Sequence, residues 1–236
     1  MNGITTLKKI WRIYLLFFAS LPICTNGQTL SGMSGLLNIP SADMQADGTF
    51  IIGANYLPAL NQPTLGYNTG NYYLNLTFLP FIEISYRMTL LKMAKGYTNQ
   101  DRSASFKIQL LKEHRFLPSI SIGVHDFHTT TTGNGNQYFE ANYIVMTKHF
   151  PINGTDLGIT SGYGTDVILK KSRFIGLFGG LSITPGFLKQ LKIMGDYDCK
   201  GINLGGSLLI LKHIYIFSMS QHLQYLAGGI AYRIYL

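Results

Sequence analysis

The stretch "NYYLNLTFLPFIEISYRMTL", residues 71–90, alternates apolar and polar side chains on both sides of a proline. Before Pro80, apolar residues occupy every second position, and Asn75 and Thr77 lie on the opposite face. After Pro80, Glu83 and Arg87 lie on the polar face of a second alternating run. Successive side chains of a β-strand point to opposite faces. The period of two therefore predicts two strands, each with one apolar face, joined by a short link at Pro80.

The same alternation continues along the chain and predicts a series of strands with this apolar face. Most have about the 9–11 residues with which a tilted strand crosses a bilayer. The predicted strands are 49–57, 70–79, 81–90, 103–111, 119–126, 137–148, 156–164, 173–183, 190–198, 201–210, 213–220 and 223–236.

The predicted connections also alternate, because short links follow every second strand and longer polar loops follow most of the others. This asymmetry is typical of outer-membrane barrels, which have short periplasmic turns and longer outer loops. The short links are 80, 112–118, 149–155, 184–189 and 211–212, and the longer loops are 58–69, 91–102, 127–136 and 165–172. An even number of strands places both termini on the periplasmic side. We therefore predict an all-β fold, a transmembrane antiparallel barrel of about twelve strands over residues 49–236.

The composition fits a protein with lipid on one side. Charged residues are only 13% of the chain, against about 25% in an average soluble protein, and hydrophobic residues are 46%. The alternative is a soluble β-sandwich or a lipocalin-like barrel, but the apolar faces of nearly all segments disfavour a fold with polar residues outside.

Residues 1–28 are typical of a secretory signal peptide, with early basic residues and an apolar run from 13 to 23. The run is about half the length that a membrane-spanning helix needs. The small residues of Thr25-Asn26-Gly27, before Gln28, suit a signal peptidase. Three of the 19 basic residues lie in this segment. Without it, the chain has 16 basic and 11 acidic residues, a net charge of +5. These lysines are not clustered, so we expect no nucleic acid as a partner.

The two cysteines give little further information. Cys24 falls in the leader, and the bulky Ile23 before it disfavours a lipoprotein site. Cys199 is then alone, so no disulfide forms within the mature chain.

The last residues, "YLAGGIAYRIYL" (225–236), alternate and end the chain. They resemble the terminal strand of outer-membrane barrels that the barrel-insertion machinery binds. We therefore expect this machinery and outer-membrane lipid as partners, and the bacterial outer membrane as the location.

Polar side chains on the inward faces are the candidates for a lumen site. Two interpretations stay open: a polar path or small ligand site, or a lumen packed with groups that pair with each other, which is the favoured one. The candidates are Glu83, Arg87, Lys107, Glu140, Lys192, Asp196 and Arg233, with the amides Gln109 and Asn142 beside them.

No motif indicates catalysis, a metal or a cofactor. His125 and His128 are spaced so that they point to opposite faces of a strand, which disfavours a shared metal ion. The sequence has no Ser nucleophile elbow and no phosphate-binding loop. We expect no enzyme, although a lipid-modifying barrel enzyme assembled in space stays an alternative.

The start of the mature chain differs from the rest, because "GLLNIPSADMQADGTF" (35–50) has no repeating period. Pro40 excludes a central strand. Ser41 can cap one helical turn over 42–46, which Asp47-Gly48 would end. We predict a compact periplasmic entry segment, residues 29–48, whose apolar residues are buried in or under the periplasmic mouth of the lumen.

Two stretches resemble the YjbH family, outer-membrane proteins tied to exopolysaccharide production. The first is "SGLLNIPSADMQADGTF" (34–50), which matches the opening motif of that family, and the second is "NLTFLPFIEISYRM" (75–88), which resembles its second hairpin. The matching residues are Gly35, Pro40, Ala42, Asp43, Met44 and Gly48 in the first, and Leu79, Pro80, Phe81, Glu83 and Tyr86 in the second.

This resemblance implies a non-enzymatic accessory in the production or export of extracellular or capsular polysaccharide, with polysaccharide or export components as partners. Familiar members are longer and carry more than one barrel-like unit, whereas this chain has room for one. The alternative function is a small passive outer-membrane pore.

Overall fold

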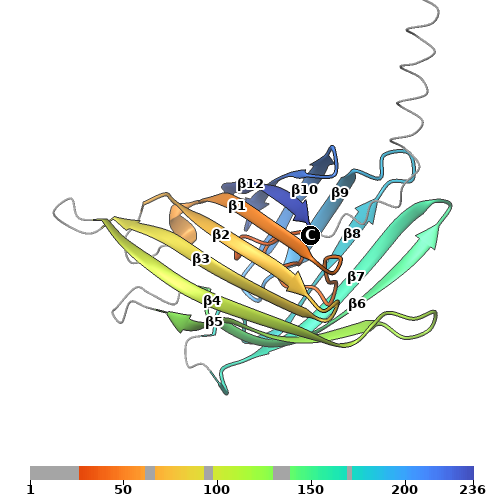
Figure 1. The fold of residues 1–236 in the computed structure, drawn as a ribbon, viewed down its shortest axis with the longest axis horizontal. Helices are drawn as coiled ribbons and strands as arrows, with labels where there is room; N and C mark the ends of the chain where they lie inside the picture. The colour runs from red at the N-terminus through yellow and green to blue at the C-terminus, as the bar shows by residue number, and fades with distance from the viewer. Residues whose placement is uncertain (1–26, 62–66, 93–97, 130–138, 169–171) are drawn as a thin grey trace, which may run out of the picture.

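The computed structural model describes residues 27–61, 67–92, 98–129, 139–168 and 172–236, which form a closed barrel of twelve antiparallel strands (Figure 1). The predicted signal peptide falls outside these residues, except for Gly27 and Gln28. The strands are β1 (Thr49–Leu57), β2 (Thr69–Phe78), β3 (Ile82–Lys92), β4 (Thr98–Leu111), β5 (Ser119–Thr129), β6 (Ala141–Ile152), β7 (Thr155–Thr165), β8 (Gly176–Thr184), β9 (Leu191–Tyr197), β10 (Ile202–Ile210), β11 (Ile214–Gln221) and β12 (Tyr225–Tyr235), and a 3₁₀ turn, η1 (Ala59–Asn61), follows β1.

Each strand pairs with its neighbours in the chain, and β1 pairs with β12 to close the sheet. The closure continues past the strand ends, because the N–H of Leu236 donates to the carbonyl of Gly48 at 3.0 Å. A closed sheet leaves no unpaired edge, which is what a strand-built protein needs in lipid. Within the described ranges, no helix is long and apolar enough to cross a membrane.

The predicted strands are confirmed in number and order, and β4 and β6 differ most from the expected bounds. β4 begins at Thr98 rather than at residue 103, since it stays paired with β3 as far as Lys92. β6 continues to Ile152, so the predicted link over 149–155 shrinks to Asn153-Gly154. Both turn residues have positive φ, 49° and 81°, as a two-residue hairpin turn that follows the strand twist requires.

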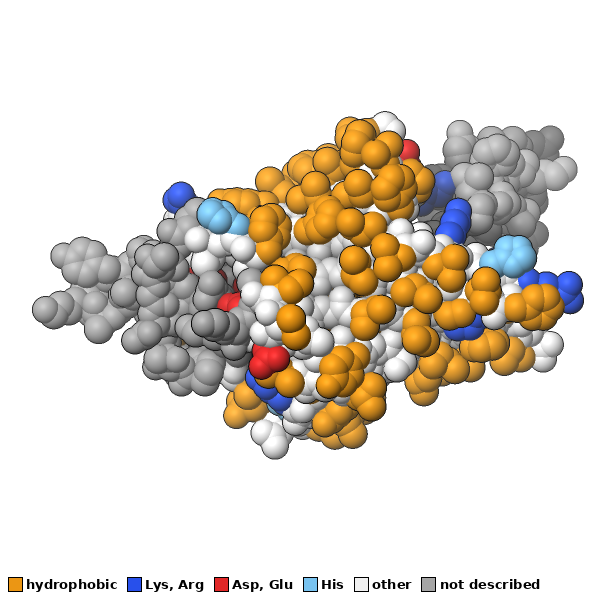
Figure 2. Space-filling view, turned by 90° about the horizontal axis from the view of Figure 1, so that it is seen from below, with side chains coloured by type: hydrophobic (Ala, Val, Ile, Leu, Met, Phe, Trp, Pro, Cys, Tyr) orange, Lys and Arg blue, Asp and Glu red, His pale blue; other side chains and the backbone are white. Residues whose placement is uncertain are grey.

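The two faces of the sheet differ as the alternation predicts. In β2, Tyr72 and Leu74 point outward and are about half exposed, while Tyr73 and Asn75 point inward and are buried. Figure 2 shows hydrophobic side chains spread over the outer surface of the barrel. The outside of this barrel is therefore more apolar than the surface of a protein that faces water on all sides.

The interior is less polar than the sequence suggested. Buried apolar side chains from the strands pack inside the barrel against Leu30, Leu36 and Ile39 of the entry segment. Several inward aromatic rings lie over a glycine on the neighbouring strand, where an added Cβ would overlap the ring. These cross-strand pairs are Gly53–Tyr73, Gly123–Tyr143 and Gly162–Phe178.

Candidate functional site

The entry segment, residues 29–48, lies inside the barrel and fills much of the lumen. Leu30, Leu37 and Ile39 are fully buried there. The segment folds back on itself through a bridge between Gly35 and Pro40. Its apolar residues were expected in or under the periplasmic mouth, and the structure places them deeper, in the barrel core.

The helical turn predicted over 42–46 is wrong, because these residues are irregular in the structure. The N–H of Ala42 donates to the hydroxyl of Thr147 at 3.0 Å. Its carbonyl accepts hydrogen bonds from Gln109 at 2.8 Å and from Ser121 at 3.1 Å. Side chains of the barrel wall thus occupy the backbone groups that a helical turn would use.

Amide side chains of β1 and β2 hold the first loop of the entry segment. The carbonyl of Leu30 accepts hydrogen bonds from Asn55 at 3.0 Å and from Asn71 at 2.9 Å. Asn75 donates to the carbonyl of Gly32 at 2.9 Å. Backbone groups buried away from water must be paired, and here the barrel wall supplies the partners.

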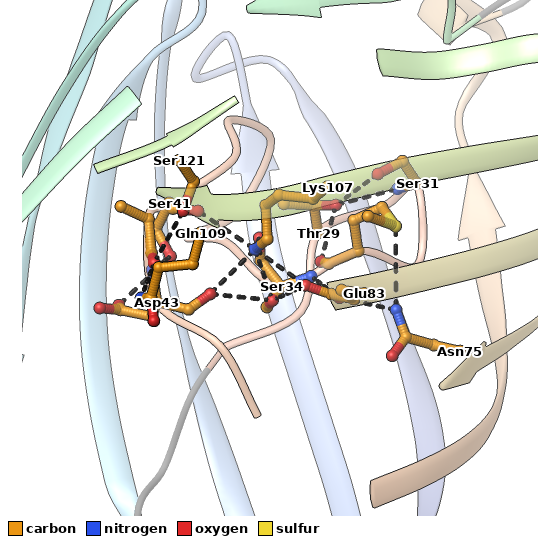
Figure 3. A network of polar contacts seen from close by, with 12 residues as sticks. Thr29, Ser31, Ser34, Ser41, Asp43, Asn75, Glu83, Lys107, Gln109 and Ser121 are labelled. Atoms are coloured by element: carbon orange, nitrogen blue, oxygen red, sulfur yellow. Dashed lines mark hydrogen bonds and ion pairs between the residues drawn. The ribbon is translucent and has the colours of Figure 1, made fainter. Parts of the chain in front are cut away.

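A buried ion pair holds the middle of the entry segment (Figure 3). Nζ of Lys107 lies 2.8 Å from Oε2 of Glu83, and neither side chain is exposed. Glu83 accepts the N–H of Ser34 at 2.7 Å and also its hydroxyl. Lys107 donates to the hydroxyl of Ser34 at 2.7 Å and to the carbonyl of Asp43 at 2.9 Å. The pair is neutral as a whole, and it fixes two separate points of the entry segment to the wall.

One carboxylate holds the turn at the tip of the entry segment. Oδ2 of Asp196 on β9 accepts the N–H groups of Leu37 at 3.0 Å, Asn38 at 2.9 Å and Ile39 at 3.4 Å. Its other oxygen accepts a hydrogen bond from Asn203 at 2.6 Å. The charge of Asp196 is thus solvated by the backbone of the entry segment.

Asp198, in the turn after β9, binds the same tip from the long-loop end. It accepts a hydrogen bond from the amide of Asn38, and its two oxygens lie 3.1 and 3.0 Å from Nε2 of His222. Burial raises the pKa of Asp198, but the charges of Arg173 and His222 and the hydrogen bonds from Asn203 and His222 outweigh burial, so the pKa lies below its usual value.

A second buried pair lies on the long-loop side of the lumen. Arg87 donates to both oxygens of Asp126 at 2.7 Å. Its guanidinium also lies 4.2 Å from the ring centre of Phe139, which Arg173 contacts at 4.8 Å. Asp126 was not among the predicted lumen residues. Asp126 points inward because its φ is +54° and the pairing of β4 with β5 shifts register beside it. The alternation of apolar and polar residues does not reveal such a shift.

The short-turn end carries a chain of polar groups centred on His149. Its Nδ1 lies 2.7 Å from Asp156, and its Nε2 lies 3.2 Å from Asp43 of the entry segment. Burial raises the pKa of Asp43, but the hydrogen bond with His149 and the charges of Lys192, His149 and Lys107 lower it to about 2. Asp43 is therefore ionised at neutral pH and ties the end of the entry segment to β6.

A cavity of about 740 Å³ lies at the same end, between residues 43–47 and the turns that follow β2, β4, β6 and β8. We call it the vestibule. Pro80, Gly154 and Lys189 line it from three of these turns, and Lys192 lines it from β9. Its volume lies within the roughly 300–1,000 Å³ of small-molecule sites.

The structure places all seven predicted lumen residues in the interior, but it does not bring them into one cluster. Glu83 and Lys107 pair with each other, whereas Arg87 pairs with Asp126. Asp196 holds the tip of the entry segment, and Lys192 lines the vestibule. Glu140 and Arg233 are buried elsewhere, the first just before β6 and the second over the ring of Tyr215, at 4.8 Å.

The residues of the two family-like motifs have identifiable structural roles. An added Cβ on Gly35 would overlap the carbonyl oxygen of Ile39, so the tight loop excludes a side chain there. Gly48 has a φ of +70°, which glycine adopts without steric cost, directly before β1. Pro80 and Phe81 form the turn between β2 and β3.

The two motifs also meet in space. Glu83 of the second motif binds Ser34, which directly precedes Gly35 of the first. The motifs are separate in the sequence, and the structure shows them as two sides of one contact, between the wall and the entry segment. Ser34, Asn55 and Asn71 were not predicted as partners, because small polar residues on an inward face do not reveal what they bind.

The comparison with protein families gives one match. The family model YjbH, described as "Exopolysaccharide biosynthesis protein YbjH", matches residues 28–193, which is more than half of the chain. The matched range covers the whole entry segment and the strands from β1 into β9. No curated protein matches the chain.

Proposed function

The chain belongs to the YjbH family, and from this premise we propose that it is a non-enzymatic accessory of extracellular or capsular polysaccharide production or export, inserted in the bacterial outer membrane. The observation that carries the accessory role is the occupied lumen. The charged groups of the wall bind the chain's own entry segment, as Glu83 and Asp196 do. Such a barrel is suited to binding or assembly at its ends and not to free passage through its centre.

The outer surface supports the membrane location. Outward-facing side chains are apolar along the strands, and aromatic ones gather near both ends, as in the two aromatic girdles of outer-membrane barrels. Exposed aromatic residues at the long-loop end include Tyr56, Tyr72, Tyr163, Tyr197 and Tyr225, and those at the short-turn end include Phe78, Phe81, Phe116, Phe150 and Tyr235. The predicted signal peptide, residues 1–28, supports export.

The proposed partners follow from this location. Outer-membrane lipid would surround the strands, and the barrel-insertion machinery would bind the terminal strand β12. Polysaccharide or components of its export system would meet the barrel at its ends. We place the short turns in the periplasm, on the side where the entry segment joins β1.

Two experiments test the proposal. We expect the expressed protein in the outer-membrane fraction, with an unheated band that migrates ahead of the heated one on a denaturing gel. We expect deletion of the gene to change the amount of extracellular or capsular polysaccharide and the intact gene to restore it. A soluble periplasmic protein would contradict the location, and unchanged polysaccharide would contradict the role.

A further inference from the structure

The acidic groups of the vestibule are already engaged by the protein. Glu113 accepts hydrogen bonds from Lys148 at 2.8 Å and from the N–H of His149 at 3.0 Å. Asp43 and Asp156 share His149 between them. Of the lining carboxylates, only the exposed Asp47 is outside this set.

The lysines of the vestibule, in contrast, have no partner among the described residues. Among the described residues, Lys112, Lys189 and Lys192 form no hydrogen bond or ion pair. Lys112 and Lys189 are exposed on the turns after β4 and β8, whereas Lys192 is inside the barrel wall and only 3% exposed. Its ammonium is not one of the fully buried polar atoms that lack a partner, so it is accessible from the vestibule that the residue lines. The charge of Lys192 reaches Asp43, whose pKa it lowers, but that carboxylate is bound to His149.

Three lysines without a protein partner, around a cavity whose carboxylates are mostly engaged, point to an anion as the ligand. Lys192 lies in the wall of the vestibule, and the two exposed lysines flank the same space. Gln109 and Ser119 line the same space, and each already donates one hydrogen bond, to the carbonyls of Ala42 and Thr147. The amide oxygen and second N–H of Gln109 and the hydroxyl oxygen of Ser119 stay available to sugar hydroxyls. A ligand with both a negative charge and many hydroxyl groups would use both kinds of side chain.

We propose that the vestibule is a binding site for an acidic saccharide, in which Lys192 binds a sugar carboxylate and Lys112 and Lys189 attract the same chain at the rim. The preference for an anion rests on the lysines, and the choice of a saccharide rests on the proposed function. The site lies at the short-turn end, so the ligand would enter from the periplasm.

Calorimetric titration of the full barrel in detergent, with trigalacturonate as the probe, tests the site. We expect trigalacturonate to bind and maltotriose, a neutral trisaccharide, to bind at least about tenfold more weakly. Binding should weaken from about 0.01 M to about 0.15 M salt, because the screening length falls from roughly 30 Å to roughly 8 Å. Lys192→Gln should weaken binding about tenfold or more. The matched control is Lys212→Gln, at another short turn outside the vestibule, which should leave binding unchanged.

The heat-dependent gel shift shows whether each variant is folded, and Lys189→Gln, on an exposed turn, gives a second variant that does not disturb the core. We expect it to weaken binding a few-fold. The site would be overturned if maltotriose or inorganic phosphate bound as tightly as trigalacturonate. It would also be overturned if Lys192→Gln and Lys212→Gln had equal effects, or if trigalacturonate did not bind. Such a result would leave the effect of gene deletion on polysaccharide intact, so the two proposals fail separately.

Discussion

The ammonium of Lys107 and the carboxylate of Glu83 meet 2.8 Å apart inside the barrel, where neither is exposed to solvent. A buried pair of this kind contributes little net stability, because desolvation offsets most of the attraction. The pair instead positions the entry segment, because both partners also bind Ser34. The pair therefore links two strands of the wall to the segment that fills the lumen.

Removing one partner of this pair should be strongly destabilising. Glu83→Gln leaves the charge of Lys107 buried without a counter-charge, which costs roughly 3–5 kcal/mol in buried pairs. The free energy of unfolding, from urea titration of the detergent-solubilised barrel, measures the loss. The control is Glu113→Gln, which breaks a pair whose side chains are 20–26% exposed and should cost less than about 1 kcal/mol. Equal losses in the two variants would contradict the assigned role of Glu83.

The contact between Asp43 and His149 should make stability depend on pH in the acid range. The pKa of Asp43 is about 2 in the folded chain, below the roughly 3.9 of an unfolded aspartate. Its stabilising contribution is therefore complete above about pH 4 and is lost as the pH falls towards 2. The shift corresponds to about 2–3 kcal/mol.

The variant Asp43→Asn isolates this contribution. At pH 6 its unfolding free energy should lie about 2–3 kcal/mol below that of the wild type, and the difference should shrink between pH 4 and pH 2. Urea titrations of both proteins over this range provide the measurement. A difference that stays constant down to pH 2 would show that the Asp43 carboxylate does not titrate as proposed.

Most of the barrel was predictable because each strand carries its own signal. In β3, polar Glu83 and Arg87 alternate with apolar residues, and this alone assigns the inward and outward faces. The Asn153-Gly154 pair also carried a turn signal, the dipeptide most typical of two-residue hairpins. The alternation predicted a longer link over 149–155, whereas β6 and β7 continue to either side of Asn153-Gly154.

The arrangement of the lumen was not predictable, because it depends on contacts between distant residues. Asp196 holds Asn38, which lies 158 residues earlier in the chain. The inward position of Asp126 results from a local change of register. The entry segment itself has no period, so its sequence indicated burial without showing which wall residues would contact it.

The close contact between Gly53 and the ring of Tyr73 provides a test of packing in the lumen. Gly53→Ala would place a methyl group where the ring now lies, and Gly32 of the entry segment packs tightly on the ring as well. Overpacking of this kind costs typically about 1–3 kcal/mol. Ala54→Val, on the neighbouring outward-facing position, is the control and should change the unfolding free energy by less than about 0.5 kcal/mol. If both variants unfold at the same urea concentration as the wild type, the ring does not lie over Gly53.

The occupied lumen predicts that the barrel conducts ions poorly, and this separates an accessory barrel from a passive pore. In planar bilayers, the wild type should show no steady single-channel current, because the entry segment is bound to the wall at Glu83, Lys107 and Asp196. A variant that lacks residues 29–46 should conduct, provided its heat-dependent gel shift shows a closed barrel. The full-length double variant Lys107→Met/Asp196→Ala keeps the segment but loses two of its anchors, and it should show intermittent openings. Steady current through the wild type would favour the pore, since a segment held by these contacts leaves no continuous aqueous path. A folded deletion variant that stays silent would instead show that wall side chains alone close the lumen, and that the entry segment is not what blocks it.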